Sequence, residues 1–295
     1  MMSAGFYSTF LHQLPVTELA GKLSQAGYSS VELNGDLWSN GFVPHVTPSL
    51  DAAGRADVAR AISDAGMSIS ALSACLHLAK ETAEERRAGI DYLKASVDLA
   101  RDIGAPVVWV FTGRAFGGID IATARKYLAA ALEEVCHHAR DRGVKFGIEG
   151  CSMHIVAKAD EYLDLFRAIP GSDVRVAFDP THFQLRGEDP VRAAELLFDR
   201  ISNFHVKDSV GLYPDFKCVP LGTGEVDLKA VTDTLRRLGY AGSASVEYES
   251  HLFGWEIPEL PNSAEMGGYR RAKKGGRDDA GPVVRDVVAR TRVPV

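Results

Sequence analysis

The segment AFDPTHFQLRG, residues 177–187, places a carboxylate and an imidazole at the end of an apolar run. The run VRVAF is followed at once by Asp179, and His182 comes three residues later. A single Asp at such a point is commonly a helix cap or an ion-pair partner, so local structure does not require both groups. Their meaning therefore depends on whether other apolar runs end in the same way.

Four successive apolar runs end in, or carry close to their end, a side chain that can bind a metal ion. The four side chains are Glu149, Asp179, His205 and Glu247. Three carboxylates packed together raise one another's pKa values unless a cation neutralises them. Three oxygens and one nitrogen suit a hard to borderline ion better than one that prefers thiolates. We therefore predict one divalent metal ion, with Mn²⁺ preferred and Mg²⁺, Co²⁺ or Zn²⁺ as the alternatives.

The elements that must position these residues alternate along the whole chain. Short β-branched or aromatic runs predict strands at 4–10, 29–33, 67–74, 106–111, 144–149, 174–178, 201–206 and 243–247. Longer amphipathic runs between them predict helices. Several of these helices end in glycine, which adopts the left-handed backbone of a helix C-terminus at low cost. These glycines are Gly27, Gly66, Gly104, Gly143 and Gly239.

Strands that alternate with helices favour parallel pairing through crossover helices. Eight such units predict an α/β fold class, with one domain over residues 1–295 that forms a (β/α)8 TIM barrel. A doubly wound open sheet is the alternative, but FLHQLP after the first strand contains no glycine-rich phosphate turn. In a barrel the four candidate ligands surround one mouth and can converge on a single point.

Three segments between a strand and the next helix exceed ordinary connection lengths. They are residues 34–49, 208–224 and 248–281. In a barrel all three lie on the C-terminal face, where active sites are built. Within the third, residues 262–280 are glycine-rich and basic, so a mobile loop is an equal alternative to an ordered one.

The composition bounds the partners of the protein. With 33 basic and 39 acidic residues, the chain has no global electrostatic reason to bind nucleic acid. Its four cysteines form no Cys-x-x-Cys pair, which favours reduced thiols. The N-terminus lacks a signal-peptide pattern, and no apolar run reaches the roughly 18 residues of a membrane span. We expect a cytoplasmic protein with neither nucleic acid nor membrane as a partner.

The C-terminal half resembles the xylose isomerase-like TIM barrels, the sugar phosphate isomerase and epimerase group. That group also includes inosose dehydratases and the endonuclease IV fold. The matching motifs, in order, are IEG at 148–150, FDPTHF at 178–183, FHVKD at 204–208, LGTGEVD at 221–227 and LGYAGSASVEYE at 238–249. The N-terminal half agrees only in its alternation of strands and helices. The resemblance implies a small carbohydrate substrate and one Mn²⁺ or similar ion, bound by the four residues that the strand ends indicate.

A metal ion that chelates the carbonyl and adjacent hydroxyl of a ketose makes the neighbouring C–H more acidic. The resemblance assigns proton removal and return to Glu149 and Glu247 as the catalytic pair. We therefore expect a sugar isomerase or epimerase that acts on a keto sugar or derivative through a cis-enediolate. If a leaving hydroxyl lies β to the carbonyl, the same chemistry gives elimination. A lyase, either an inosose-type dehydratase or an enzyme that eliminates C-glycosides, is thus the alternative.

Further residues are candidate substrate contacts. They are His182, Lys217, Lys207, Asp208, His77 and His154. The resemblance implies that His182 reaches a substrate oxygen, and the alternative is that it orients a ligand carboxylate. Lys217 stands where the epimerase branch carries an Arg, although Lys lacks the bidentate fork. Lys207 and Asp208 match the His-x-Lys-Asp form of other branches, with a buried ion pair as the alternative.

His77 follows the third predicted strand and His154 follows Glu149, so both can face the barrel mouth, although histidines on surface loops are common. An endonuclease IV-like DNA repair enzyme is the remote alternative. That family needs three zinc ions, and the strand at 106–111 ends in Thr112 where it would supply a His. A non-catalytic sugar-binding barrel would not need the metal set. A homo-oligomer is compatible with the resemblance, since such barrels often pair through their helices or rim loops.

Overall fold

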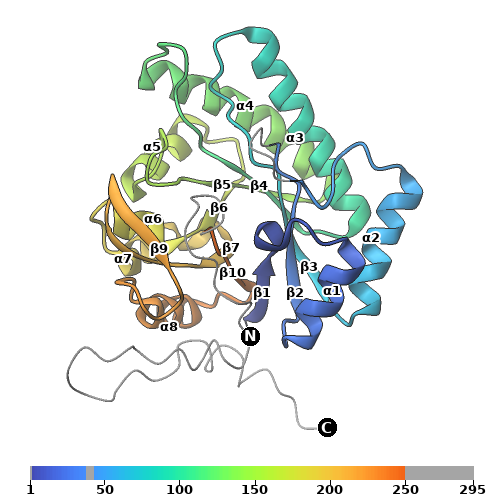
Figure 1. Ribbon diagram of the computed structural model, residues 1–295. Helices are drawn as coiled ribbons and strands as arrows, with labels where there is room; N and C mark the ends of the chain where they lie inside the picture. Colours follow the sequence, from blue (N-terminus) through green and yellow to red (C-terminus); the bar gives the residue numbers. More distant parts are fainter. Residues whose placement is uncertain (1, 38–42, 250–295) are drawn as a thin grey trace, which may run out of the picture.

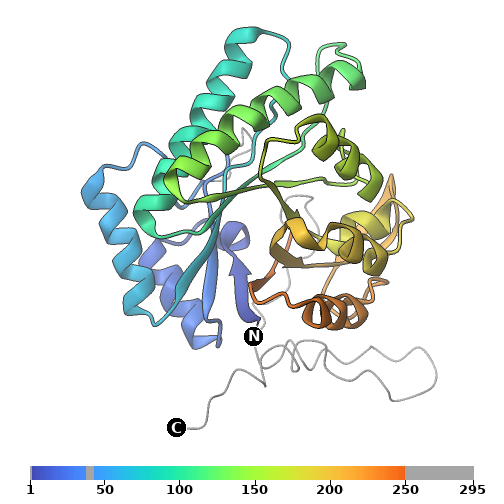
Figure 2. The same ribbon diagram turned by 180° about the vertical axis from the view of Figure 1, so that it is seen from behind.

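The computed structural model describes residues 2–37 and 43–249 of the chain, and the predicted loop at 262–280 lies outside them. Parallel strands form a closed barrel in the order β1-β10-β7-β6-β5-β4-β3-β2 (Figure 1). The strands are β1 Ser3–Tyr7, β2 Ser30–Asn34, β3 Ser68–Ser73, β4 Val107–Phe111, β5 Lys145–Glu149, β6 Val174–Phe178, β7 Ile201–Val206 and β10 Ser243–Val246. The barrel closes where β1 pairs with both β2 and β10, as the view from behind shows (Figure 2). The predicted (β/α)8 barrel is confirmed.

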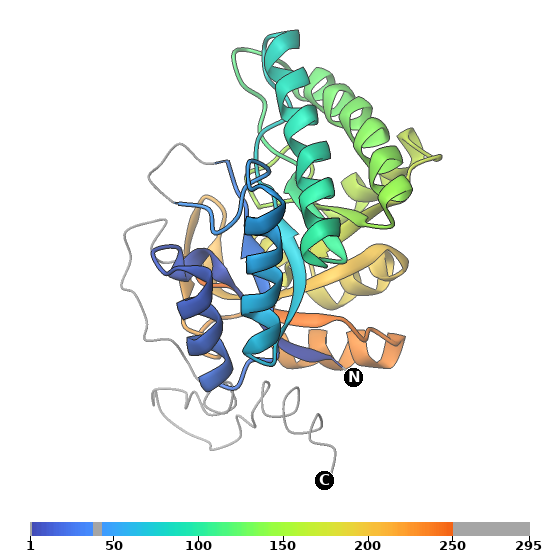
Figure 3. The ribbon, with the colours of Figure 1, turned by 90° about the vertical axis from the view of Figure 1, so that its right-hand side faces the viewer.

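The helices surround the barrel, and α1, α2 and α3 pack side by side along one flank (Figure 3). They are α1 Val16–Gln25, α2 Ala52–Asp64, α3 Ala83–Ile103, α4 Ile121–Arg142, α5 Ala159–Ala168, α6 Pro180–Leu185, α7 Pro190–Leu197 and α8 Leu228–Leu238, with 3₁₀ turns η1 Ser8–Leu11 and η2 Phe198–Arg200. The predicted glycine stops all have φ values from +68° to +97°. Across residues 2–37 and 43–249, every helix is too short or too polar to cross a membrane.

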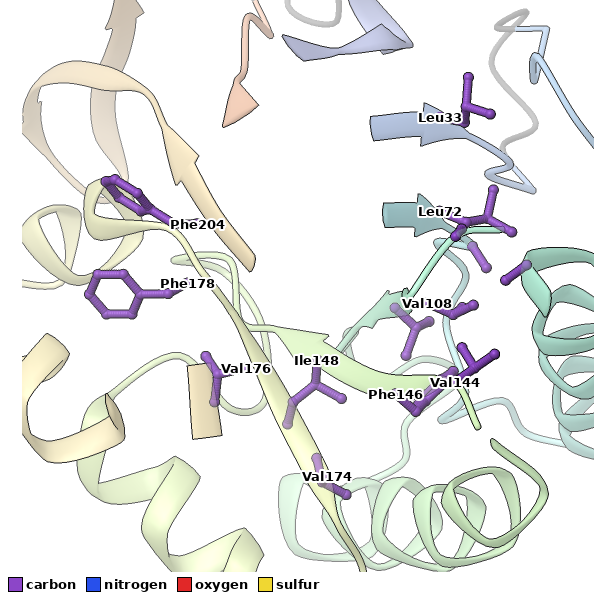
Figure 4. Packing of buried hydrophobic residues seen from close by; sticks show 14 of the residues in the cluster. Leu33, Leu72, Val108, Val144, Phe146, Ile148, Val174, Val176, Phe178 and Phe204 are labelled. Atoms are coloured by element: carbon purple, nitrogen blue, oxygen red, sulfur yellow. The ribbon is translucent and has the colours of Figure 1, made fainter. Parts of the chain in front are cut away.

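Successive side chains of each strand point to opposite faces, and this alternation divides the molecule into two layers. Outward-facing residues join the helices in one large hydrophobic core. Figure 4 shows part of it, in which Phe146 and Ile148 of β5 lie beside Val174 and Val176 of β6. Both faces of the strands are buried, yet several strands still alternate, with small or polar side chains such as Ser30 and Glu32 of β2 on the inward face.

Inward-facing residues fill the barrel itself. A second apolar cluster there includes Tyr7, Trp109 and Phe111. Where β10, β1 and β2 meet, the inward side chains are small, and Ser30 Oγ lies 2.8 Å from Ser243 Oγ. A Cβ at Gly5 would lie 2.2 Å from Ser243 Oγ, so only glycine fits between them. The interior of the barrel is thus packed below its mouth. The polar side chains at the carboxyl ends of the strands lie above this packing.

The segment after β7 differs from the sequence prediction. We expected a long loop at 208–224, but most of it is an antiparallel hairpin of β8 Asp208–Leu212 and β9 Asp215–Val219. The first strand is also shorter than predicted, because the chain turns into η1 after Tyr7. The other barrel strands agree with the predictions within two residues at each end.

Asp208 ties the hairpin to the loop that follows it. Its carboxylate accepts hydrogen bonds from the backbone N–H groups of Ser209, Gly222, Gly224 and Val226, at 2.9, 2.9, 2.9 and 3.2 Å. A Cβ at Gly224 would lie 2.1 Å from Asp208 Oδ1, so the loop approaches the carboxylate more closely than other residues allow. The LGTG motif is therefore folded around a buried anion.

Replacing Asp208 with Asn should destabilise the protein, because an amide NH₂ group would face backbone donors that now share a carboxylate. We expect the free energy of unfolding to fall by roughly 2–4 kcal/mol. Urea denaturation measures this change, with exposed Asp215→Asn on the same hairpin as the control. An equal free energy in both variants would contradict the anchoring role.

Candidate metal centre and active site

The four predicted ligands converge at the carboxyl end of the barrel. Glu149 ends β5, Asp179 follows β6, His205 lies on β7, and Glu247 follows β10. All four are buried, and one potential ligand atom from each lies within 4.8 Å of the others. Neighbouring strands β5, β6, β7 and β10 are paired in this order, so their inward positions must face one another. The arrangement is a compact set of three carboxylates and one imidazole.

His205 lies at the middle of this set. Its Nδ1 is 2.8 Å from Glu149 Oε1 and 3.2 Å from Glu247 Oε2. Burial alone would lower the pKa of His205, but the surrounding carboxylates outweigh it and raise that pKa well above its usual range. The ring therefore serves as a counter-cation in the metal-free protein.

Lys207, two residues further along the chain, brings a second cation into the centre. Its Nζ lies 2.7 Å from Asp179 Oδ2, 3.2 Å from Glu247 Oε2 and 3.0 Å from Glu249 Oε2. Burial would lower the pKa of this ammonium, yet the carboxylates raise it well above its usual value. Lys207 is thus a buried, charged contact of two candidate ligands.

The residues fit a divalent cation by charge and by donor type. Five buried or nearly buried carboxylates gather around His205 and Lys207, so anions outnumber cations. Burial raises the pKa of Glu247 well above its usual range despite the nearby ammonium. Lys207 Nζ approaches Asp179 Oδ2 without the alignment of a hydrogen bond, and this oxygen has no hydrogen-bond partner in the described chain. A buried carboxylate oxygen without a hydrogen-bond partner, in a cluster of anions, is a suitable ligand for a metal ion.

Comparison with known proteins agrees with this geometry. The model of the xylose isomerase-like TIM barrel family matches residues 20–271. The chain belongs to this family. Its relatives include fructoselysine 3-epimerase of Shigella flexneri, with 22% identity over 255 residues, covering 83% of this chain and 90% of that protein. The relatives of the chain thus include a sugar epimerase, in accord with the predicted enzyme class.

Solved structures share the fold at low identity. The apo form of 3-keto-D-glucoside 4-epimerase, YcjR, from E. coli has a TM-score of 0.71 and 14% identity, covering 90% of this chain and 96% of that one. The IolI protein, solved with a bound zinc atom, has a TM-score of 0.69 and 19% identity, covering 83% and 88%. At least one solved structure with this fold therefore contains a bound zinc atom.

His182 lies beside the centre, at the start of α6. Its Nε2 is 3.4 Å from Asp179 Oδ2 and 3.3 Å from Lys207 Nζ, while its Nδ1 accepts from the backbone N–H of Ser152 at 3.4 Å. Burial, and then the ammonium of Lys207, lower the pKa of His182. A neutral ring in contact with Asp179 suits both interpretations of this residue, orientation of the carboxylate and contact with substrate.

His77 and His154 lie together on another side of the mouth. Their rings are 6.0 Å apart and perpendicular, and His154 also packs against Phe111 with ring centroids 5.0 Å apart. Burial lowers the pKa of His77 to about 4 and that of His154 well below its usual value. In the sequence the two histidines follow different strands. In the structure they lie side by side as two neutral rings.

Two predicted substrate contacts are not brought to the centre. Lys217 is exposed on β9, whereas the next residue, Cys218, is buried. The Sγ atom of Cys218 lies 3.8 Å from Glu249 Oε2. Because neighbouring residues of a strand point to opposite faces, Lys217 points away from that glutamate. Asp208 is also directed elsewhere, since backbone amides occupy its carboxylate.

Two acidic residues in the centre escaped the sequence analysis. Glu249 follows Glu247 by two residues, a spacing that puts both on the same face of an extended chain and that could have signalled it. Glu32 lies in the fully buried strand β2, and its Oε1 is 3.0 Å from His205 Nε2. An acidic residue inside the short run SVELN was the available signal there.

Replacing Lys207 with Met preserves volume but removes the buried ammonium, which leaves Asp179, Glu247 and Glu249 without their counter-charge. The metal-free variant should lose about 3–5 kcal/mol of stability. Added Mn²⁺ should then raise its melting temperature more than that of the parent protein, because the ion supplies the missing positive charge.

Thermal unfolding with and without Mn²⁺ measures both effects. Exposed Lys229→Met on α8 is the control, and it should resemble the parent protein in both conditions. Equal metal-induced shifts in the Lys207 variant and the parent would contradict the electrostatic coupling.

Proposed function

We propose that this protein is a divalent-metal-dependent isomerase or epimerase of a keto sugar or a close derivative. One observation carries the proposal: two buried glutamates, Glu149 and Glu247, approach the same His205 nitrogen from different strands. Two carboxylates held close together on different strands can act as a pair, in which one removes a proton from a substrate carbon and the other returns a proton. Membership of a family whose relatives are sugar epimerases and isomerases supports this reading.

Glu149, Asp179, His205 and Glu247 would hold the metal ion, with Mn²⁺ as the preferred species. When bound, the ion supplies Lewis acidity that stabilises negative charge on the oxygen of a carbonyl substrate. The protein's own contribution is a dry, buried setting in which each charged group is worth more than in water. All four residues are at most 3% exposed.

The proton transfers fall to the two glutamates. One carboxylate takes the proton from the carbon beside the carbonyl, and the C–H electron pair moves to give a cis-enediolate. The other carboxyl group then delivers a proton to the same carbon, which completes epimerisation. For isomerisation the proton goes to the adjacent carbon, and the hydroxyl proton moves to the former carbonyl oxygen as the new carbonyl group forms at the first carbon.

Elimination is the second reading, and Lys207 is the observation that favours it. Its buried ammonium lies 3.3 Å from His182 Nε2 and so adds a hydrogen-bond donor that can stabilise a departing hydroxyl group beside the carboxylates. If the substrate carries a hydroxyl β to the carbonyl, the carboxyl group that took the C–H proton can protonate that oxygen, and water leaves as the electron pair of the carbanion forms a C=C bond. The lyase proposal therefore requires the same residues and differs only in the product.

A small carbohydrate is the substrate that this centre suits. Neutral, half-buried His77 and His154 are placed to meet hydroxyl groups, while the net-acidic chain opposes a nucleic acid. Thr112 still stands at the end of β4 where a DNA repair enzyme of the endonuclease IV type would need a histidine. The DNA repair function is therefore the least favoured of the three candidate functions.

Solvent exchange tests the proposal directly. The Mn²⁺-loaded protein is incubated in D₂O with ketopentoses and ketohexoses, free and phosphorylated, and deuterium uptake is followed by proton NMR. We expect uptake at the carbon beside the carbonyl of at least one sugar. Product analysis then separates epimer, isomer and dehydrated sugar.

Glu149→Gln and Glu247→Gln should each slow this exchange by roughly 10²–10⁴-fold, because each removes one of the two proton-transfer groups. Glu133→Gln, on the exposed side of α4, is the control and should leave the rate unchanged. Undiminished exchange in both glutamine variants would sink the assignment of the catalytic pair.

A further inference from the structure

We infer that Glu32 positions His205, by holding the proton on Nε2 so that Nδ1 presents its lone pair to the metal ion. The inference rests on the proposed metal site and adds a residue outside the ligand set. Glu32 lies in the middle of β2, across the barrel from β7, and is fully buried. It therefore reaches His205 from the side opposite to the candidate ligands.

The two nitrogens of His205 face different groups. Nδ1 is directed at Glu149 and Glu247, whereas Nε2 lies 3.0 Å from Glu32 Oε1. A neutral imidazole carries one N–H, and the nitrogen that binds a metal ion must be the other one. If Nδ1 is the ligand, Nε2 has to donate a hydrogen bond, and the carboxylate of Glu32 is the acceptor in place.

A competing neighbour makes this carboxylate necessary. The amide Nδ2 of Asn203 lies 3.3 Å from His205 Nε2, and as a donor it would favour the opposite tautomer. The contact with Glu32 is shorter, and its acceptor is charged, so it should prevail over a neutral amide. Without Glu32, Asn203 would draw the proton to Nδ1 and oppose metal binding.

Glu32 and the imidazole are both held in place by aromatic side chains. The indole N–H of Trp109 donates to the same oxygen, Glu32 Oε1. Tyr7 stacks on His205 with ring centroids 6.0 Å apart and an interplanar angle of 2°, and Trp109 meets the imidazole edge-on at 5.1 Å. The aromatic rings fix the plane of His205, and Glu32 fixes its tautomer.

A purely structural role explains Glu32 poorly. Its Oε2 is buried and has no hydrogen-bond partner within residues 2–37 and 43–249. A carboxylate with one unpaired oxygen costs stability in such a site, and an apolar residue of similar size is often neutral or better. The retained charge is therefore better explained by its effect on His205.

Two substitutions separate these roles. Glu32→Leu removes the acceptor at similar volume, and Glu32→Gln keeps an acceptor oxygen without the charge. We expect Mn²⁺ affinity, measured by loss of the free-ion EPR signal, to fall 10–100-fold in the Leu variant and less in the Gln variant. Glu161→Gln is the matched control, because Glu161 is a half-buried glutamate on α5 that pairs with Arg125 outside the barrel.

Long-range ¹⁵N NMR of the Zn²⁺-loaded protein supplies a second readout, which should show a proton on Nε2 of His205 in the parent protein. Parent-like affinity in both Glu32 variants, or an equal loss in Glu161→Gln, would overturn the inference while the metal site stands. A parent protein that binds no Mn²⁺ would instead overturn the proposed function. If Glu32→Leu does not fold, the Gln variant alone decides, because parent-like affinity there overturns the inference.

Discussion

Ionised carboxylates buried side by side repel one another unless a cation neutralises them, and the rest of this centre follows from that constraint. Glu149, Asp179 and Glu247 are buried within reach of one another at the mouth of the barrel. In the metal-free state their charge is balanced in part by His205 and Lys207, whose pKa values are raised in response. A divalent ion, as proposed here, would complete the balance and relieve the mutual repulsion of the carboxylates.

The hydrophobic packing of the barrel offsets the cost of burying so many charged groups. Strand alternation sends apolar side chains outward to the helices and polar ones inward, and aromatic and small residues pack the interior below the mouth. The helices and the outer core supply the stability, so the few inward positions at the strand ends are free for chemistry. The centre spans the barrel from β5 to β2, because Glu149 and Glu32 contact the same imidazole.

The sequence predicted the barrel and the strand-end ligands because both depend on local patterns. Alternating periodicity gives the fold, and a strand end at the barrel mouth needs no knowledge of long-range contacts. The roles of the other candidate residues depend on where their side chains point, which local patterns do not determine. Lys217 is exposed because the hairpin register turns Cys218 inward, and Asp208 binds backbone amides because the LGTG loop folds onto it. Glu32 acts across the barrel on a residue 173 positions away, which no local pattern reveals.

The most direct test of this account is the metal content of the purified protein, measured by mass spectrometry after loading with Mn²⁺ and removal of free ions. The comparison is a variant that combines Asp179→Ala with Glu247→Gln. The account predicts one ion per chain in the parent protein and loss of that ion in the variant. Three zinc ions per chain would instead favour the DNA repair reading, and a parent protein that retains no metal would contradict the account.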